Sequence, residues 1–229
     1  MRAAARRYCQ PVTFARFERL ALCDLLDAVG PDAPTLCVPW TTYDLAAHLW
    51  LRETDPLAAS GIAVKSLAAQ TARRMGELQT RVSYPELVQR LRTGPARYSL
   101  FNLPGVDAAA NATEYFIHHE DVRRAGAPAA EPRDLGHETQ DWIFRRLRVM
   151  ARAFWRRAKV GVVLERDDDA AGSIDERAFR VSPGTHTVTL VGKPSELLLF
   201  TSGRTGVAVV ERIGDDEGLA ELARTRLDF

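Results

Sequence analysis

The spacing of apolar residues changes near residue 158, and this change constrains the fold more than any other feature of the chain. Before it, apolar residues recur at helical spacing, as in Phe14, Phe17, Ala21 and Leu25. After it, segment 186–191 alternates threonine with apolar residues, which is typical of a half-buried strand. We therefore predict an α+β chain with a flexible arm over residues 1–12, a helical bundle over residues 13–158 and a small α+β domain over residues 159–229.

Capping and stop signals mark the expected helices. Thr13 can cap a first helix that ends at Gly30, and Thr41 with Asp44 resembles a capping box that opens a second helix over 42–53. Further helices are expected over 61–80, from residue 83 to Gly94, and over 107–125. Four long helices joined by loops predict an antiparallel bundle.

The segment after residue 159 predicts short elements in the order β-β-β-α-β-α. The expected strands and helices are strand 160–165, strand 177–181, strand 186–191, helix 195–202, strand 206–213 and helix 215–227. This order predicts a small unit with a sheet that leans toward antiparallel pairing.

Composition narrows the class of protein. The 229 residues include 31 basic and 30 acidic side chains, so a net charge of +1 argues against a nucleic-acid partner. No run approaches the roughly 18 apolar residues of a membrane span, and the arginine-rich start leads into no apolar signal core. The three cysteines, Cys9, Cys23 and Cys37, form no CxxC pattern, which favours a reducing cytoplasm.

The expected helix 107–125 contains two candidate ligands for a metal ion. Glu114 and His118 are four residues apart, so their side chains stack on one face within reach of one ion. His119 pairs at the same spacing only with Tyr115, a poor ligand for a divalent ion, so His118 is the better candidate. A plain helix-surface ion pair has the same spacing, and a carboxylate facing a core can also take a buried arginine as its partner.

A third ligand must come from elsewhere in the chain, and His48 is a candidate because it is the only other histidine within an expected helix of this half, at 42–53. A lone histidine in such a helix is usually a satisfied core residue. If it joins the pair, two imidazoles and one carboxylate leave a coordination position open, which is the plan of catalytic zinc; nickel, manganese or iron would also accept these ligands. Asp44 and Asp121 are available to orient the imidazoles.

No GxSxG, HExxH, P-loop or GxGxxG pattern occurs in the chain. The turn Ser202-Gly203-Arg204 reverses the chain between a helix and a strand, and it presents Arg204 with an expected exposed guanidinium. Such a group can donate two parallel hydrogen bonds to a carboxylate, so Arg204 is a candidate catalytic residue.

Separated motifs then give a family resemblance. They are 30–37 (Gly-Pro-Asp-Ala-Pro-Thr-Leu-Cys), Trp40, 44–49 (Asp-Leu-Ala-Ala-His-Leu), Arg52-Glu53, Gly94-Pro95, Asn111, 114–125 (Glu-Tyr-Phe-Ile-His-His-Glu-Asp-Val-Arg-Arg-Ala), 161–164 (Gly-Val-Val-Leu) and 196–200 (Glu-Leu-Leu-Leu-Phe). In these the chain resembles the DinB-like, mycothiol-dependent maleylpyruvate isomerase superfamily, and within it an actinobacterial metal-binding subgroup of undefined activity. The resemblance covers nearly the whole chain beyond the first dozen residues.

The resemblance implies a DinB-like four-helix bundle followed by a sterol-carrier-like C-terminal domain. It also implies a metal triad of His48, Glu114 and His118, zinc as the metal and mycothiol as the cosubstrate. Arg204 matches the position of an arginine implicated in catalysis in the isomerase branch. The chain departs from the true isomerases in one respect, because no segment marks a maleylpyruvate pocket.

Three hypotheses of function follow. The first is a cytoplasmic, monomeric or homodimeric, metal-dependent enzyme that holds a thiol as its thiolate and acts on a small electrophile, as an S-transferase or a thiol-assisted isomerase. The second is a non-catalytic module that binds metal and thiol. The third is a metal hydrolase that uses bound hydroxide and needs no thiol.

Overall fold

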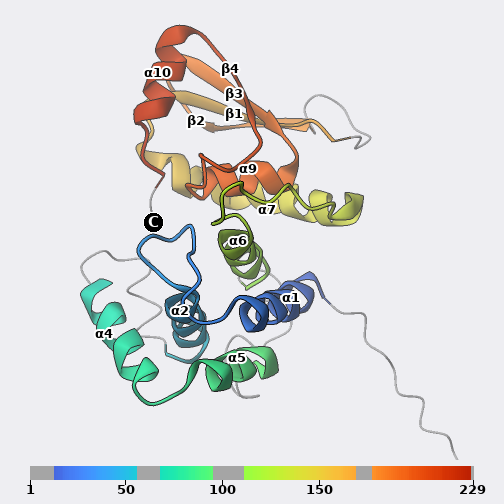
Figure 1. Ribbon diagram of the computed structural model, residues 1–229. Helices are drawn as coiled ribbons and strands as arrows, with labels where there is room; N and C mark the ends of the chain where they lie inside the picture. The colour runs from blue at the N-terminus through green and yellow to red at the C-terminus, as the bar shows by residue number, and fades with distance from the viewer. Residues whose placement is uncertain (1–12, 56–67, 95–110, 169–176, 228–229) are drawn as a thin grey trace, which may run out of the picture.

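Helices and strands divide along the chain as the change of spacing predicts. The computed structural model (Figure 1) describes residues 13–55, 68–94, 111–168 and 177–227. A series of helices precedes a four-stranded mixed sheet, which confirms the α+β prediction. The predicted arm over residues 1–12 lies outside the described residues. Within the described ranges, no helix has both the length and the apolar character needed to cross a bilayer.

The first part of the chain forms the helices that the capping signals predict. They are α1 (Phe14–Val29), α2 (Thr42–Thr54), α4 (Ala68–Gln79), α5 (Tyr84–Thr93) and α6 (Ala112–Arg123). The Thr13 side chain caps α1, and Thr41 with Asp44 forms a complete capping box at the start of α2. Gly30 and Gly94 end α1 and α5 at positive φ, a conformation that favours glycine. The starts of the predicted helices 61–80 and 107–125 lie outside the described residues.

The second part contains α7 (Gly136–Phe154), the short helix η4 (Trp155–Arg157) and the sheet. Its other elements are β1 (Gly161–Arg166), β2 (Ala178–Ser182), β3 (Thr187–Gly192), α9 (Pro194–Thr201), β4 (Glu211–Ile213) and α10 (Asp216–Arg224). The strand order is β2-β1-β3-β4. The β1–β2 and β3–β4 pairs are antiparallel, whereas β1 and β3 are parallel because β2 reverses the chain between them.

The prediction of a strand over 206–213 was wrong for its first half. Only Glu211–Ile213 pairs with β3. The backbone N–H groups of Val207 and Ala208 donate to the carbonyl of Arg204, and that of Val209 donates to the Glu196 carboxylate. The first two donors close a turn and the third binds a side chain, so these three groups are not available to the sheet.

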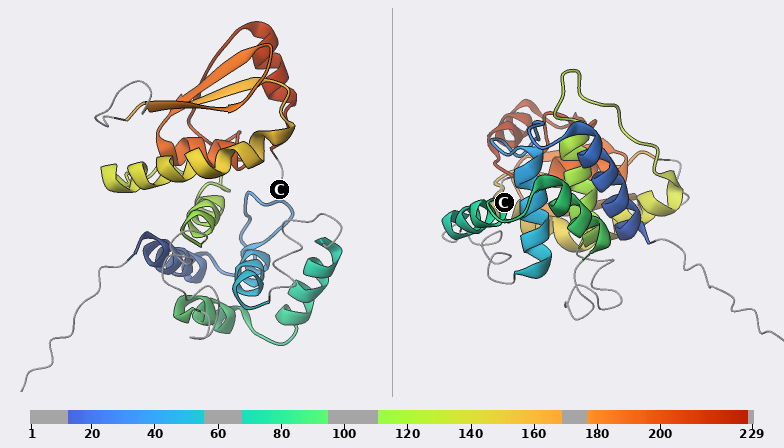
Figure 2. Two further views of the ribbon diagram at one scale, coloured as in Figure 1. Left: turned by 180° about the vertical axis from the view of Figure 1, so that it is seen from behind. Right: turned by 60° about the horizontal axis from the view of Figure 1, so that its bottom comes forward.

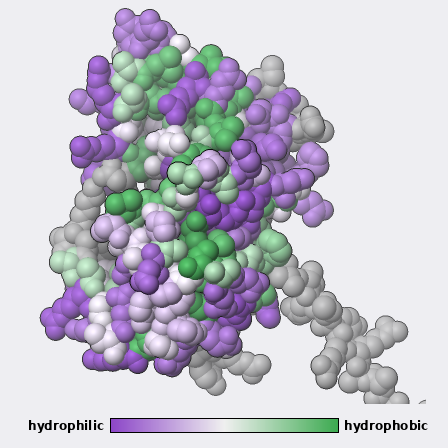
Figure 3. Space-filling view, viewed as in Figure 1, coloured by the Kyte–Doolittle hydropathy of each residue, from purple (hydrophilic) through white to green (hydrophobic). Residues whose placement is uncertain are grey.

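Helix α6 lies between two hydrophobic cores (Figures 1 and 2). Its Phe116 and Ile117 belong to a core with α7, α9 and the sheet, and its Tyr115 and Val122 belong to a core with α1, α2 and α5. Helices α7 and α9 lie against one another beneath the sheet. Figure 3 shows a largely hydrophilic face broken by apolar patches. Because α6 is enclosed on both sides, its polar side chains must find partners inside the protein.

Candidate metal centre

Helices α2 and α6 bring the three predicted ligands together. His48 comes from α2, whereas Glu114 and His118 come from α6, and their potential ligand atoms all lie within 4.8 Å of one another. His118 Nε2 is 3.5 Å from Glu114 Oε2, and the rings of His48 and His118 have centroids 5.3 Å apart. The geometry therefore offers two imidazoles and one carboxylate to a single ion.

The His48 side chain is buried and incompletely satisfied. Among buried side-chain polar atoms in the described residues, Nδ1 of His48 is the one without a hydrogen-bond partner. Burial, and then the neighbouring charge of His118, lower the pKa of His48 to about 3. The imidazole is therefore neutral and keeps a lone pair, the form in which histidine binds metals. Trp40 packs against this ring with centroids 4.9 Å apart.

Asp121 orients His118. Its Oδ2 lies 2.8 Å from His118 Nδ1, which leaves Nε2 directed toward Glu114. A carboxylate behind a ligating imidazole fixes the ring and its tautomer. The other carboxylate proposed for this role, Asp44, does not contact His48, because it caps α2 through Thr41 and accepts a hydrogen bond from Gln79.

Two carboxylates make this position attractive to positive charge. Burial by itself lowers the pKa of His118, but hydrogen bonds with Asp121, Cys37 and Glu114 outweigh it and raise that pKa well above its ordinary value. Burial raises the pKa of Glu114, yet His118 and Arg52 bring it down to about 2. The two carboxylates therefore favour a positive charge at His118, and a divalent ion would replace the proton on His118.

The arginine anticipated as an alternative partner for Glu114 is also present. Arg52 Nε lies 3.6 Å from Glu114 Oε2, and the Arg52 guanidinium also donates to Asn111 Oδ1. Arg52 pairs with Glu114 as Arg204 pairs with Asp121, so each carboxylate beside His118 already faces an arginine. The ligand atoms of the triad nevertheless still lie within reach of one another.

The expectation of an exposed guanidinium on Arg204 was wrong. Only 13% of its side chain is exposed, and its Nε and Nη2 donate to the two oxygens of Asp121 at 2.8 and 2.6 Å. Nη1 donates to the Ser202 carbonyl at 2.5 Å. The turn that carries Arg204 packs onto α6. The guanidinium that could bind a substrate carboxylate therefore already binds the carboxylate of Asp121.

Cys37 is a member of the site that sequence reasoning missed. Its Sγ donates to Asp121 Oδ2 at 3.1 Å and accepts from Arg204 Nη2 at 3.3 Å. Cys37, His118 and Asp121 form a second group with metal-ligand spacing. The triad with His48 is the better ligand set, because Asp121 is already shared by His118 and Arg204. No local pattern around Cys37 could have signalled this position, which depends on the packing of loop 30–41 against α6.

One cavity joins these residues. It has a volume of about 780 Å³ and is lined by the triad, by loop residues 36–38 and Trp40, and by the turn that contains Arg204. Its walls thus come from both halves of the chain. A volume of this size suits a small-molecule ligand.

The remaining described histidines lie elsewhere. His119 Nδ1 is 2.9 Å from Glu18, and His186 forms an exposed group with Asp215 and Glu217. His137 lies in the first turn of α7 and is exposed.

Comparisons with protein-family models, with curated proteins and with solved structures found no match.

Proposed function

We propose that this chain is a metal-dependent enzyme that uses a low-molecular-weight thiol, acting on a small electrophile as an S-transferase or a thiol-assisted isomerase. The observation that carries the proposal is the convergence of two imidazoles and one carboxylate on a cavity, with a buried His48 nitrogen that lacks a partner within the described residues. Three N/O ligands beside an open cavity suit a catalytic metal better than a structural one. The resemblance described above supports mycothiol as the thiol.

His48, Glu114 and His118 would hold the ion. The resemblance favours zinc, and nickel, manganese or iron would accept the same ligands. A divalent ion there would lower the pKa of a thiol and so supply a nucleophile at neutral pH.

The chain's own residues prepare that chemistry. Asp121 holds the Nδ1 proton of His118, and Arg204 fixes Asp121 through two hydrogen bonds. Trp40 covers the His48 ring, which keeps water from one side of the site. In this proposal Arg204 is a positioning residue that acts through Asp121.

The same resemblance supports an architecture for the whole chain. We place the metal site in a DinB-like four-helix bundle, with a sterol-carrier-like C-terminal domain that contributes Arg204. A cytoplasmic monomer or homodimer with a small thiol and a small electrophile as partners completes the proposal.

The metal content of the purified protein tests the site. Elemental mass spectrometry should find about one equivalent of a divalent metal in the wild type, as one three-ligand site implies, and much less in His48→Ala and Glu114→Ala. Glu77→Ala, which changes an exposed carboxylate on α4, is the control and should keep the metal. Wild-type protein that can be neither isolated with metal nor reloaded would refute the proposal.

A conjugation assay then tests the reaction class. Thiol and electrophile should combine or rearrange only with the metal-loaded protein. Thiol binding without turnover would instead favour the non-catalytic module, and activity without any thiol would favour the hydrolase.

A further inference from the structure

The charged side chains around the cavity are already paired. Of the described residues that line it, Glu114 and Arg204 carry a full charge, and His118 does when it is protonated. Glu114 contacts Arg52 and His118, whereas Arg204 binds both oxygens of Asp121. The cavity wall therefore presents no described cation that is free to receive an anionic ligand.

The rest of the cavity wall is mainly apolar. Leu36, Val38 and Trp40 come from the loop before α2, Ala72 and Met75 from α4, and Ile117 from α6. A carboxylate that enters this part of the cavity, away from the metal position, loses water and gains no counter-ion, so its binding is disfavoured. An uncharged apolar group gains by leaving water.

We propose that the cavity selects an uncharged, apolar electrophile, and that Asp121 sets this preference by neutralising Arg204. This inference rests on the proposed function, because it concerns the second substrate of the same site. Arg204 is the one described cation of the cavity wall whose guanidinium could otherwise receive a carboxylate directly. Its two hydrogen bonds to Asp121 and one to the Ser202 carbonyl hold the group in the wall. Asp121 is thus a specificity-determining residue.

A pair of thiol probes can measure the preference without any turnover. Benzyl mercaptan and its para-carboxylate carry the same sulfur and ring and differ by one negative charge. Isothermal titration calorimetry on zinc-loaded wild-type protein should give a Kd for the carboxylate on the order of tenfold weaker, because its charge finds no partner in the cavity wall.

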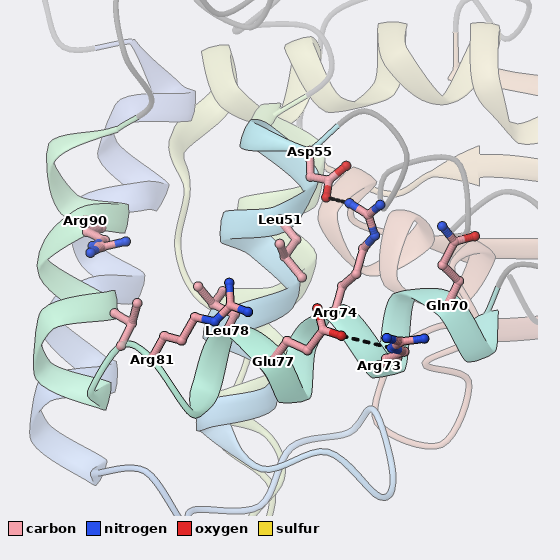
Figure 4. Close-up of a pocket in the computed structure, with 10 residues that line it drawn as sticks. Leu51, Asp55, Gln70, Arg73, Arg74, Glu77, Leu78, Arg81 and Arg90 are labelled. Carbon is pink, nitrogen blue, oxygen red and sulfur yellow. Dashed lines mark hydrogen bonds and ion pairs between the residues drawn. The ribbon is translucent and has the colours of Figure 1, made fainter.

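The ratio to follow is the Kd of the carboxylate probe divided by the Kd of benzyl mercaptan. Two variants should move this ratio in opposite directions. Asp121→Asn can still accept the His118 proton but removes the negative charge that pairs with Arg204, so the ratio should fall to about one or reverse. Arg204→Gln leaves the Asp121 carboxylate without its guanidinium, so the ratio should rise. Glu77→Gln is the matched control, because it releases Arg73 from an ion pair outside this cavity (Figure 4) and should leave the ratio unchanged.

The outcomes separate this inference from the proposed function. Tighter binding of the carboxylate to the wild type overturns the inference and leaves thiol binding intact. An unchanged ratio in both variants overturns the role of Asp121. If neither probe binds the zinc-loaded protein, the thiol-binding function fails and the inference fails with it.

Discussion

The two faces of α6 hold adjacent histidines in opposite settings. His118 faces a cavity that Glu114 and His48 also line, and Nδ1 of His48 has no hydrogen-bond partner. His119 faces α1 and contacts Glu18, which also receives two hydrogen bonds from Arg133. Burial raises the pKa of Glu18, but the hydrogen bonds from His119 and Arg133 lower it further than burial raises it.

The ion network continues from His119 toward the C-terminal half. Arg133 also donates to Glu120, and Arg124 links Glu120 to Glu196 at 2.5 and 2.7 Å. Arg124, Glu120 and Glu196 are all at least 98% buried, so this network joins the two halves where no water can replace a lost partner. Buried polar groups that satisfy one another are structural, whereas a group left unsatisfied beside a cavity indicates a ligand.

The largest effect, on metal content, should come from replacing each of the two histidines by alanine in separate variants. His118→Ala removes a ligand, so metal content should fall from about one equivalent to near zero. His119→Ala removes a contact to Glu18, which Arg133 still binds, so the metal should remain. Elemental analysis of both proteins gives the answer, and equal losses would erase the distinction between the two faces.

Variants in the buried ion network of Arg124, Glu120 and Glu196 should show the next largest effect, a loss of stability. Arg124→Met leaves the carboxylates of Glu120 and Glu196 buried without this guanidinium, which should lower the free energy of unfolding by about 3–5 kcal/mol. The neighbouring Arg123→Met removes a partly exposed partner of Glu120 and should cost about 1 kcal/mol or less. Urea unfolding measures both, and comparable costs would contradict a network that depends on burial.

A smaller effect should distinguish Asp121 from Asp44, the two aspartates that the sequence makes available to orient the imidazoles. Asp121→Asn weakens the support of His118 and should reduce zinc affinity about 10- to 100-fold. Asp44→Asn disturbs the α2 cap, so it should cost about 1 kcal/mol of stability or less and leave zinc affinity unchanged. Competition with a zinc chelator measures the affinities. A fall in affinity for Asp44→Asn alone would reverse the assignment.

The smallest effect concerns a third histidine–carboxylate pair, His186 with Asp215, which is exposed. The hydrogen bond to Asp215 raises the pKa of His186, and that from His186 lowers the pKa of Asp215. The stabilisation by His186 is therefore complete below its ordinary pKa of about 6.5 and is lost as pH rises through the raised value. The stabilisation by Asp215 is present above its ordinary pKa and is lost as pH falls through the lowered value.

Thermal melts of wild type and His186→Gln test this pair. The wild type should have a slightly higher Tm at about pH 5.5, where His186 is protonated and Asp215 is ionised. The Tm values of the two proteins should converge at alkaline pH, where His186 is neutral. Salt should shrink the difference because both groups are exposed. A pH-independent difference would show that the histidine acts through packing.

Local rules predicted the parts of this molecule that depend on neighbours in sequence. The caps of α1 and α2 formed as expected, because a capping residue and the backbone N–H groups it binds lie within three or four residues of one another. The Glu114–His118 pairing on one face of α6 follows from the helical repeat in the same way. The prediction of a strand was wrong over 206–210, because backbone N–H groups of this segment bind Arg204 and Glu196. The sequence of the segment does not reveal these partners.

The α+β class, the order of the elements and the three side chains that meet between α2 and α6 could be predicted from sequence patterns. Packing between distant segments sets the rest: Arg204 binds Asp121, Cys37 joins the site and His119 belongs to an ion network. The physical reason is burial: a charged group enclosed between two cores must take whichever partner packing brings within reach, and those partners lie 83, 167 and 101 residues apart along the chain.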